Sequence, residues 1–341
     1  MTHEVQEGMR GNKMIPEGSK QAGRAAPKRK LRIAPRIAVL LAILVVLVIG
    51  ISIAKPEFLS VLNLLNLVRQ ISILATVCVG MTFVIVSGGI DISVGSSIAF
   101  SGAFGVFVLN ATGSALLGMI ASLVFGSAVG AANGIMIGKF RMSPFIATLA
   151  TMVLARGLAL SLTNAKSVPV TSPAFVWLGQ ASVGPLPAVL LFMIVLYLLS
   201  GFVLNRTVLG RDTFAIGGNR LAAVAAGRRV DATILYIYIL AGVTVGIGSI
   251  ITVGRLSSAQ PWAGLGLEFD VITAVVLGGT SLSGGEGDIK GTLLGALIFG
   301  VIANGLDLLN VGPFYTSVFR GVVLLVVVLI DRFSSRLQTS Y

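Results

Sequence analysis

Six charged residues stand in or at the ends of strongly apolar stretches of the chain. They are Asp91, Arg156, Glu268, Asp270, Asp307 and Arg320. A charged side chain is costly at such a depth in a membrane, so these residues are candidates for contact with a polar substrate or an ion. Asp91, Asp307 and Arg320 can equally lie at a membrane surface. Arg156, inside ATMVLARGLALSL, has a structural alternative, namely an ion pair or a contact with helix-end carbonyls.

Residues that commonly perform enzyme chemistry are scarce. His3 is the only histidine and Cys78 the only cysteine, which argues against histidine acid–base catalysis and against His/Cys metal sites. No set of nucleophile, base and orienting group accompanies the charged residues. We therefore expect no catalytic residue, no metal site and no enzyme activity in this chain.

The stretch GGTSLSGGEG at 278–287 contains LSGGE, which looks like the signature of ATP-binding-cassette ATPases. Such an ATPase also needs a phosphate-binding loop of the form G-x-x-x-x-G-K-[ST], and the chain has none. The stretch instead ends one apolar segment and precedes another. We therefore interpret it as a glycine-rich break at a helix end, formed by Gly278, Gly279, Gly284 and Gly285.

A second glycine-rich string, GGIDISVG at 88–95, aligns with 278–285 and suggests a faint internal repeat. Glycine-rich helix ends also recur for trivial reasons, so a chance likeness stays open. Transporters often have their working sites at the boundary between internal repeats. The candidates for a translocation path or hinge are accordingly Gly88, Gly89, Asp91, Ser93, Arg156, Glu268, Asp270, Gly278, Gly279, Gly284 and Gly285.

The composition of the chain is that of a membrane protein. Of 341 residues, 55% are hydrophobic and 11% are charged, against about 25% charged in a soluble domain. Apolar segments fall at about 37–54, 68–88, 94–110, 114–138, 144–163, 187–205, 232–254, 268–282, 290–310 and 315–331. The segments at 94–110 and 268–282 are short for a span, which predicts broken or re-entrant helices. The fold class is an all-α polytopic integral membrane protein with about ten transmembrane helices.

The charge distribution orients the chain. Much of the net charge of +12 precedes residue 37, and Arg206, Arg211, Arg220, Arg228 and Arg229 follow one another in a later loop. By the positive-inside rule, both termini are cytoplasmic. The location of these charges beside spans argues against nucleic-acid binding.

The predicted domains are a basic and disordered cytoplasmic tail at 1–36, a transmembrane domain at 37–333 and a cytoplasmic tail at 334–341. Within the domain, residues 206–231 form a cytoplasmic segment with two short helices that turn around Gly217-Gly218. This segment is either a linker or a docking surface for a partner. Glycines at 126, 130, 134 and 138 form a small-residue ridge, which favours close helix packing within one subunit over a subunit interface.

Four long strings resemble one family closely. These are VGMTFVIVSGGIDISVGS at 79–96, PFIATLATMVLARGLA at 144–159, LGRDTFAIGGNRLAAVAAG at 209–227, and the stretch from RLSSAQPWAG to LDLLNV at 255–311. They look like the permease subunits of ribose-type monosaccharide ABC importers, and the resemblance covers about residues 37–333.

The resemblance implies a bacterial inner-membrane permease that works with three partners. They are a second permease copy, a cytoplasmic ABC ATPase, usually a fused tandem one, and a periplasmic sugar-binding protein. ATP and Mg would be bound by that ATPase, with no cofactor in this chain. The coupling segment corresponds to about 211–229, and the expected coupling residues are Gly210, Gly217, Gly218 and Asn219.

The substrate implied is a monosaccharide carried from the periplasm to the cytoplasm, with ribose favoured over other sugars. Two alternatives stay open at this stage. One is an ion-coupled secondary sugar transporter that needs no ATPase, and the other is a subunit that pairs with a different permease.

Overall fold

The structure, a computed structural model, describes residues 33–339, with side chains for residues 36–332. Most of the predicted basic tail, including its KRKLR cluster at 28–32, lies outside the described residues, as do residues 340–341. The first half of the fold contains α1 (Ile33–Ala54), η2 (Pro56–Leu59), α2 (Val61–Val86), α3 (Val94–Thr112), α4 (Ala115–Gly138), α5 (Pro144–Thr163), β1 (Val168–Pro169), α6 (Pro173–Gln180), β2 (Ser182–Val183) and β3 (Leu186–Pro187).

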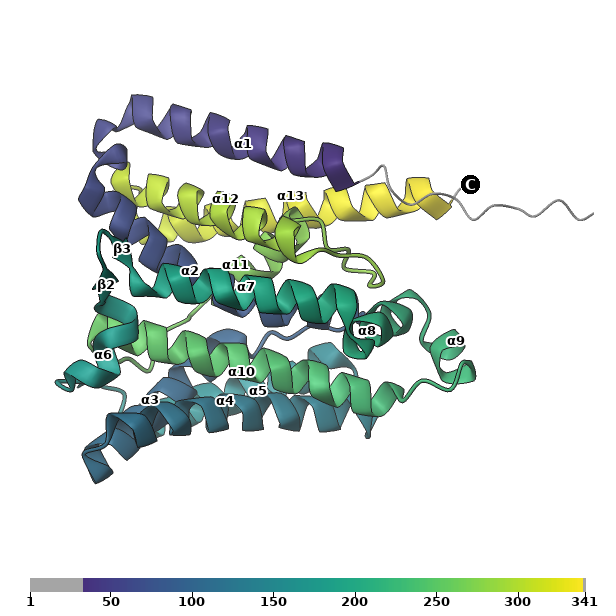
Figure 1. Cartoon of the computed structure of the whole chain (residues 1–341), viewed down its shortest axis with the longest axis horizontal. Coiled ribbons are helices and arrows are strands. Elements are labelled where there is room, and N and C mark those ends of the chain that lie inside the picture. The colour runs from purple at the N-terminus through teal and green to yellow at the C-terminus, as the bar shows by residue number, and fades with distance from the viewer. Residues whose placement is uncertain (1–32, 340–341) are drawn as a thin grey trace, which may run out of the picture.

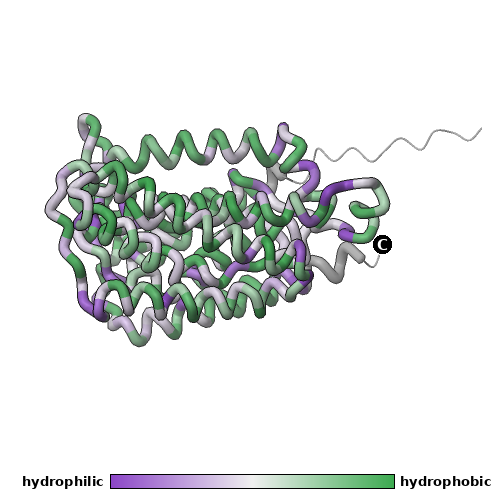
Figure 2. Tube along the Cα trace, turned by 90° about the horizontal axis from the view of Figure 1, so that it is seen from below, coloured by the Kyte–Doolittle hydropathy of each residue, from purple (hydrophilic) through white to green (hydrophobic). Residues whose placement is uncertain are grey.

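The second half contains α7 (Ala188–Arg206), α8 (Val208–Gly218), α9 (Arg220–Ala225), α10 (Val230–Leu256), β4 (Ser258–Ala259), α11 (Leu267–Leu277), α12 (Ile289–Leu308) and α13 (Pro313–Thr339). The long helices form one roughly parallel bundle, with α8 and α9 at one end and α6, β2 and β3 at the other (Figure 1). Hydrophilic residues gather mainly at these two ends (Figure 2). The only strands among the described residues are two-residue pairs, β1 with β4 and β2 with β3.

Nine of the described helices are long and apolar enough to cross a membrane. They are α1, α2, α3, α4, α5, α7, α10, α12 and α13. The tenth predicted span, 268–282, is helical only over the 11 residues of α11, so the expectation of a broken helix is confirmed there. The same expectation is wrong for 94–110, because α3 is a continuous helix of 19 residues.

The segment 257–288 nevertheless passes from one end of the bundle to the other. It starts at β4, which pairs with β1 beyond the far end of α10. It reaches the opposite end where the amide of Gly285 donates a hydrogen bond to the carbonyl of Val86. Because the segment 257–288 crosses the bundle in addition to the nine long helices, the beginning of α1 and the end of α13 lie at the same end. This is the end that carries α8 and α9 (Figure 1).

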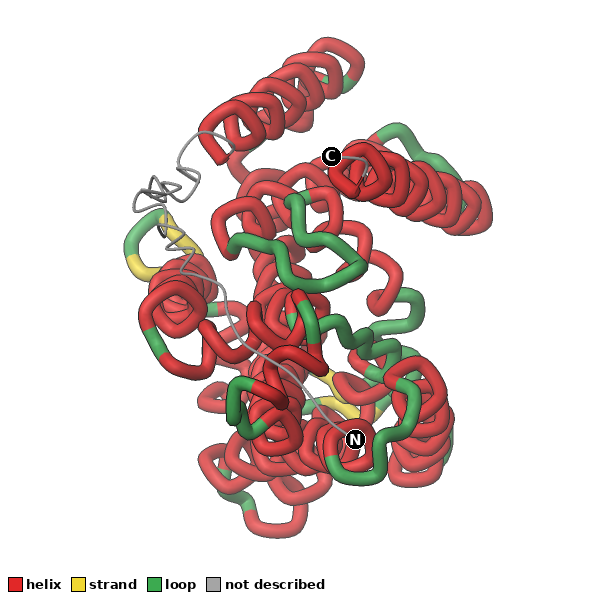
Figure 3. The backbone as a smooth tube through the Cα atoms, turned by 90° about the vertical axis from the view of Figure 1, so that its right-hand side faces the viewer, coloured by secondary structure: helices red, strands yellow, loops and turns green. Residues whose placement is uncertain are grey.

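Burial separates a central helix from peripheral ones. In α2, 78% of the apolar window is buried, whereas α1 and α13 bury 6% and 11% of theirs. Seen from the α8–α9 end, α1 and α13 lie at the rim of the bundle (Figure 3). Exposed apolar helices of this kind are stable only against lipid or another protein, which agrees with a membrane-embedded fold.

The glycine ridge of α4 packs on α10, as predicted for contact within one subunit. A Cβ on Gly126, Gly130, Gly134 or Gly138 would collide with backbone atoms of α10 between Asp231 and Gly246. Small residues allow two backbones to approach this closely. The ridge therefore fixes α4 against α10 and positions the residues of α4 that face the glycine-rich segment 87–93.

Candidate coupling and translocation site

Three segments with glycine pairs meet at the α8–α9 end of the bundle. They are the end of α2 with Gly88, the end of α8 with Gly217 and Gly218, and the loop 278–288 with Gly284 and Gly285. The Gly285 amide donates to the Val86 carbonyl over 2.8 Å. A Cβ on Gly217 would overlap that same carbonyl and would stand 2.5 Å from the nitrogen of Gly285. The three backbones are thus in direct contact.

Backbone conformation at this junction requires glycine. Gly88, Gly284 and Gly285 have φ angles of +79°, +79° and +75°, values that residues with a Cβ rarely adopt. A Cβ on Gly284 would lie 2.9 Å from the Cα of Gly88, and one on Gly285 would lie 2.9 Å from the Cα of Gly218. The LSGGE string is therefore a packing contact between helix ends.

The remaining predicted hinge glycines also pack closely. A Cβ on Gly278 would overlap the carbonyl of Gly291 in the first turn of α12, and one on Gly279 (φ +101°) would meet the guanidinium of Arg36. Gly89 faces the hydroxyl of Tyr238, which itself donates to the carbonyl of Ile90 over 3.0 Å. These contacts tie the string at 88–95 to α10 and the string at 278–285 to α1 and α12.

The predicted coupling residues divide into packed and exposed positions. Gly210 is buried, and a Cβ there would overlap the Leu204 carbonyl at the end of α7. Gly218, in contrast, is exposed, and a Cβ there meets no atom within 4 Å. Asn219 separates the two short helices and caps α9, because its side-chain oxygen accepts from the amide of Ala222 over 2.9 Å. The two helices and the turn were predicted correctly.

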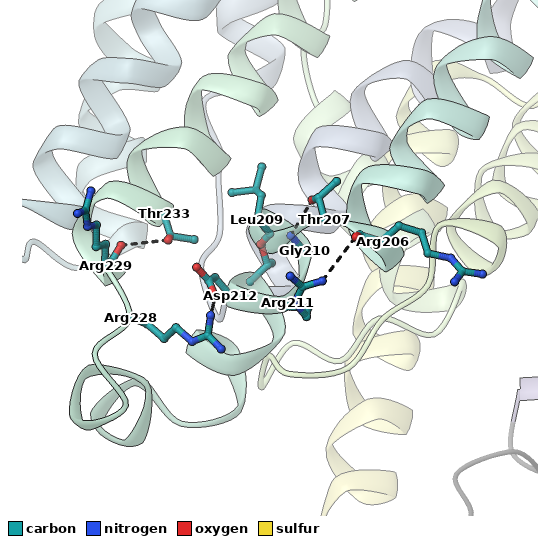
Figure 4. A network of polar contacts seen from close by, with 10 residues as sticks. Arg206, Thr207, Leu209, Gly210, Arg211, Asp212, Arg228, Arg229 and Thr233 are labelled. Carbon is teal, nitrogen blue, oxygen red and sulfur yellow. Dashed lines mark hydrogen bonds and ion pairs between the residues drawn. The ribbon is translucent and has the colours of Figure 1, made fainter.

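Ion pairs fix the α8–α9 segment, and Figure 4 shows the one between Asp212 and Arg228. Arg228, which follows α9, pairs with Asp212 of α8 at 2.9 Å. Arg220 pairs with Asp231 in the first turn of α10 at 3.6 Å. Both arginines are almost half exposed, so each pair contributes modestly to stability. Their geometry fixes the orientation of α9 relative to α8 and α10.

The outer face of α9 is apolar and exposed. Leu221 and Val224 are one helical turn apart and are 83% and 56% exposed. They stand at the arginine-rich end of the bundle, beside Gly218. An apolar face among basic residues, with no cover from the described chain, is typical of a protein interface.

Asp91 and Ser93 belong to a buried polar network. Both the amide and the hydroxyl of Ser93 donate to Asp91 Oδ1, at 2.8 Å and 2.6 Å. Asn133 of α4 donates to Ser93 over 3.1 Å and to Asp91 over 3.4 Å, and it accepts from Thr151 of α5 over 2.6 Å. Asp91 is 4% exposed and Ser93 1%. The network braces the segment 87–93 against α4 and α5.

Arg156 contacts backbone carbonyls, which was the structural alternative for this residue. Its guanidinium donates to the carbonyl of Pro261 and, over 3.0 Å, to that of Ala263. It therefore holds the non-helical segment that leads into α11. Glu268, in the first turn of α11, is 6% exposed, and its carboxylate lies beside Gly95, where a Cβ would overlap it.

Asp270 is paired with Arg320, with 3.3 Å between the charged atoms. The Asp270 side chain is 10% exposed and that of Arg320 is 34% exposed. The pair joins α11 to α13. The structure thus brings the glycines of three segments together. Among the charged candidates, Glu268 and Asp270 share the first turn of α11, with Arg320 and Arg156 bound near it, whereas Asp91 belongs to a separate network. In residues 36–332, no three His, Cys, Asp or Glu side chains gather as metal ligands would.

Sequence comparison identifies the family. Residues 63–328 match the family model described as the permease component of the branched-chain amino acid transport system. The chain belongs to this permease family. It is a multi-pass protein of the inner membrane, as predicted. No solved structure gives a significant match.

Curated relatives of the permease are named for sugars. The chain is 44% identical to the ribose import permease protein RbsC of Bacillus subtilis over 291 residues, which is 85% of this chain and 90% of that one. It is 42% identical to RbsC of Escherichia coli K12 over 292 residues, 84% and 91% of the two chains. It is 36% identical to the L-arabinose ABC transporter permease protein AraH of Azospirillum brasilense over 291 residues, 85% and 86% of the two chains. The predicted likeness to sugar permeases is thereby confirmed.

Proposed function

We propose that this permease is the membrane-spanning subunit of an ABC importer that moves a monosaccharide, ribose before others, from the periplasm into the cytoplasm. The names of its relatives support the sugar and the importer class. The observation that carries the mechanism is the contact of Gly217 with Val86 and Gly285. Through it, any displacement of the exposed α8–α9 segment acts on the ends of both glycine-rich strings.

The positive-inside rule assigns the arginine-rich α8–α9 end to the cytoplasm. A cytoplasmic ABC ATPase, a fused tandem one, docks there and receives the exposed face of Leu221 and Val224 in a cleft. ATP and Mg are bound and ATP is hydrolysed in that partner. This chain supplies no catalytic group and only converts movement of the ATPase into a change between outward-facing and inward-facing states.

Two further partners complete the importer. A periplasmic binding protein docks at the opposite end, where α6, β2 and β3 lie, and releases the sugar. A second copy of the permease forms the other half of the path, and the exposed apolar surfaces of α1 and α13 are compatible with a partner as well as with lipid. Disulfide crosslinks between copies in the assembled complex distinguish this homodimer from a pair with a different permease.

Uptake into proteoliposomes tests the proposal. The permease is reconstituted with an ABC ATPase and a periplasmic sugar-binding protein of the same organism, and labelled ribose, arabinose and leucine are offered outside. We expect ribose uptake that requires ATP on the ATPase side. The uptake is expected to stop when the lysine of the ATPase phosphate-binding loop is replaced by alanine.

Gradient-driven sugar uptake by the permease alone, without ATP, would contradict the proposal and favour the ion-coupled alternative. Uptake of leucine in place of sugars would assign the substrate class in the family description instead. Arabinose uptake faster than ribose uptake would keep the importer class and change the sugar.

A further inference from the structure

A cavity of about 230 Å³ lies between α2, α3, α10, α11, α12 and α13. Its polar lining residues are Gln70, Thr252, Arg255, Asp270 and Arg320. Thr252 stands about 33 Å along α10 from Val230, at the helical rise per residue. The cavity is therefore close to the end of the bundle that lies away from α8 and α9.

The size of the cavity is suitable for a small sugar. A cavity of about 150 Å³ holds benzene, so a pentose with about ten non-hydrogen atoms needs about 250 Å³ in proportion. The volume here is close to that value. A disaccharide would not fit without movement of the surrounding helices.

The lining combines charged and amide groups with an apolar wall. Asp270 pairs through Oδ2 with Arg320, and its Oδ1 is buried with no hydrogen-bond partner in the described chain. Gln70 is only partly buried, and its side-chain amide, with two donors and an acceptor, makes no hydrogen bond to the described residues. A buried unsatisfied oxygen such as Asp270 Oδ1 is normally met by water or a ligand. Phe299, 3% exposed, supplies an apolar surface.

We propose that this cavity is a sugar-contact site on the outward side of the path, in which Asp270 and Gln70 bind hydroxyl groups of a monosaccharide directly. The inference rests on the proposed function and deepens it. Sugar hydroxyls both donate and accept, so a carboxylate, an amide and two guanidinium groups around one space can hold several of them at once. The apolar face of the sugar ring packs against Phe299. Such a site selects among sugars after the binding protein has released its cargo.

A second cavity of about 350 Å³ is a natural comparison. It is lined by residues of α3, α5 and β1 that include Phe107, Asn110, Leu162 and Thr163, and no charged residue lines it. Volume alone would favour this cavity, but its lining offers few partners for a ring of hydroxyl groups. It serves as the control site in the experiment.

Thiol modification tests occupancy of the cavity directly. Cys78 is the only cysteine and is buried, so the Cys78→Ala permease is a cysteine-free background. In the complete reconstituted complex, Ala303→Cys places a thiol on the cavity wall and Ala111→Cys places one on the second cavity. We expect ribose and arabinose, and not leucine, to slow modification at position 303 and to leave position 111 unchanged.

Transport by lining variants tests the contact itself. Asp270→Asn keeps the shape of the side chain, and Gln70→Leu removes donors that no other described residue uses. We expect each to lower ribose uptake by about tenfold, the factor for one hydrogen bond to a polar or charged group. Each is also expected to change the ratio of ribose to arabinose uptake. ATP hydrolysis stimulated by the binding protein should stay at the wild-type rate, because neither residue lies near the α8–α9 end.

Three results would overturn the inference while the proposed function stands. One is a wild-type complex that imports ribose while sugar leaves modification at position 303 unchanged. Another is uptake and sugar preference in both lining variants that equal those of the wild type. A loss of uptake together with equal loss of ATP hydrolysis would indicate a structural role and would also contradict the site. If the wild-type complex imports no sugar at all, the proposed function itself fails.

Discussion

Replacing Gly217 with alanine is the most direct test of the glycine junction, because Gly218 beside it is a matched control. The added methyl group at position 217 would overlap the Val86 carbonyl and approach the Gly285 nitrogen to 2.5 Å. At position 218 the same methyl group meets no atom within 4 Å. Both residues end the same helix, so the substitutions differ mainly in packing.

The expected magnitude follows from the contacts. Overpacking costs about 1–3 kcal/mol, and separation of the segments weakens the Gly285–Val86 hydrogen bond, worth about 0.5–1.5 kcal/mol. Alanine recovers at most about 0.5–1 kcal/mol of helix propensity. Gly217→Ala should therefore lose roughly 1–3 kcal/mol of stability, and Gly218→Ala should be neutral or slightly stabilised.

The measurement compares thermal midpoints in detergent with ATP-dependent ribose uptake in proteoliposomes. We expect Gly217→Ala to lower both the midpoint and the uptake per ATP hydrolysed, since the contact that links α8 to the two helix ends is forced apart. Gly218→Ala should match the wild type in the midpoint. Equal midpoints and equal uptake for the two variants would refute the reasoning that the junction depends on backbone contact.

Three further perturbations examine other parts of the site. Gly218→Trp should leave the thermal midpoint and membrane insertion unchanged but lower ATP-driven uptake at least about tenfold, which corresponds to about 1.4 kcal/mol of binding free energy at the interface. Normal uptake would show that Gly218 is not part of the docking surface. Arg156→Ala should lower the free energy of unfolding by about 1.5–3 kcal/mol, because its charged hydrogen bonds are lost. The thermal midpoint should fall, Arg156→Lys should restore it in part, and an unchanged midpoint would exclude a bracing role. Asn133→Leu should cost about 1–3 kcal/mol, because Asp91 Oδ2 loses its donor and the Thr151 hydroxyl loses its side-chain acceptor. It is measured by the same midpoint, and wild-type stability would show that the network is dispensable.

The helical architecture and the glycine positions were predictable because their signals are local. The apolar runs predicted nine helices at the right places, and the Gly-Gly-Asn turn predicted the break between α8 and α9. The shortness of 268–282 predicted the incomplete helix α11. The same reasoning failed for 94–110, because glycines and serines within α3 depress hydropathy without breaking a helix that is buried among other helices.

Contacts between side chains on different helices could not be predicted from local sequence patterns. Asp91 and Asn133 are 42 positions apart and meet only through the tertiary packing that sets α4 beside the segment 87–93. An asparagine in the middle of an apolar span was itself a signal, and it identifies Asn133 in retrospect. Arg320 was recognised as an unusual charge, but its pairing with Asp270 depends on how α13 lies against α11.

The glycines do more in this fold than permit bending. At Gly88, Gly217 and Gly284, three segments from distant parts of the sequence share one small volume, and none has a side chain to occupy it. A contact made only by backbone atoms transmits a displacement directly, because no side chain is present whose rotamer change could absorb the movement. The loop 278–288 is also closed on itself by hydrogen bonds from Ser281 to Glu286 and from Gly284 to Ser281. A displacement of α8 would therefore shift this loop as one piece, and the bending would fall on its connections to α11 and α12.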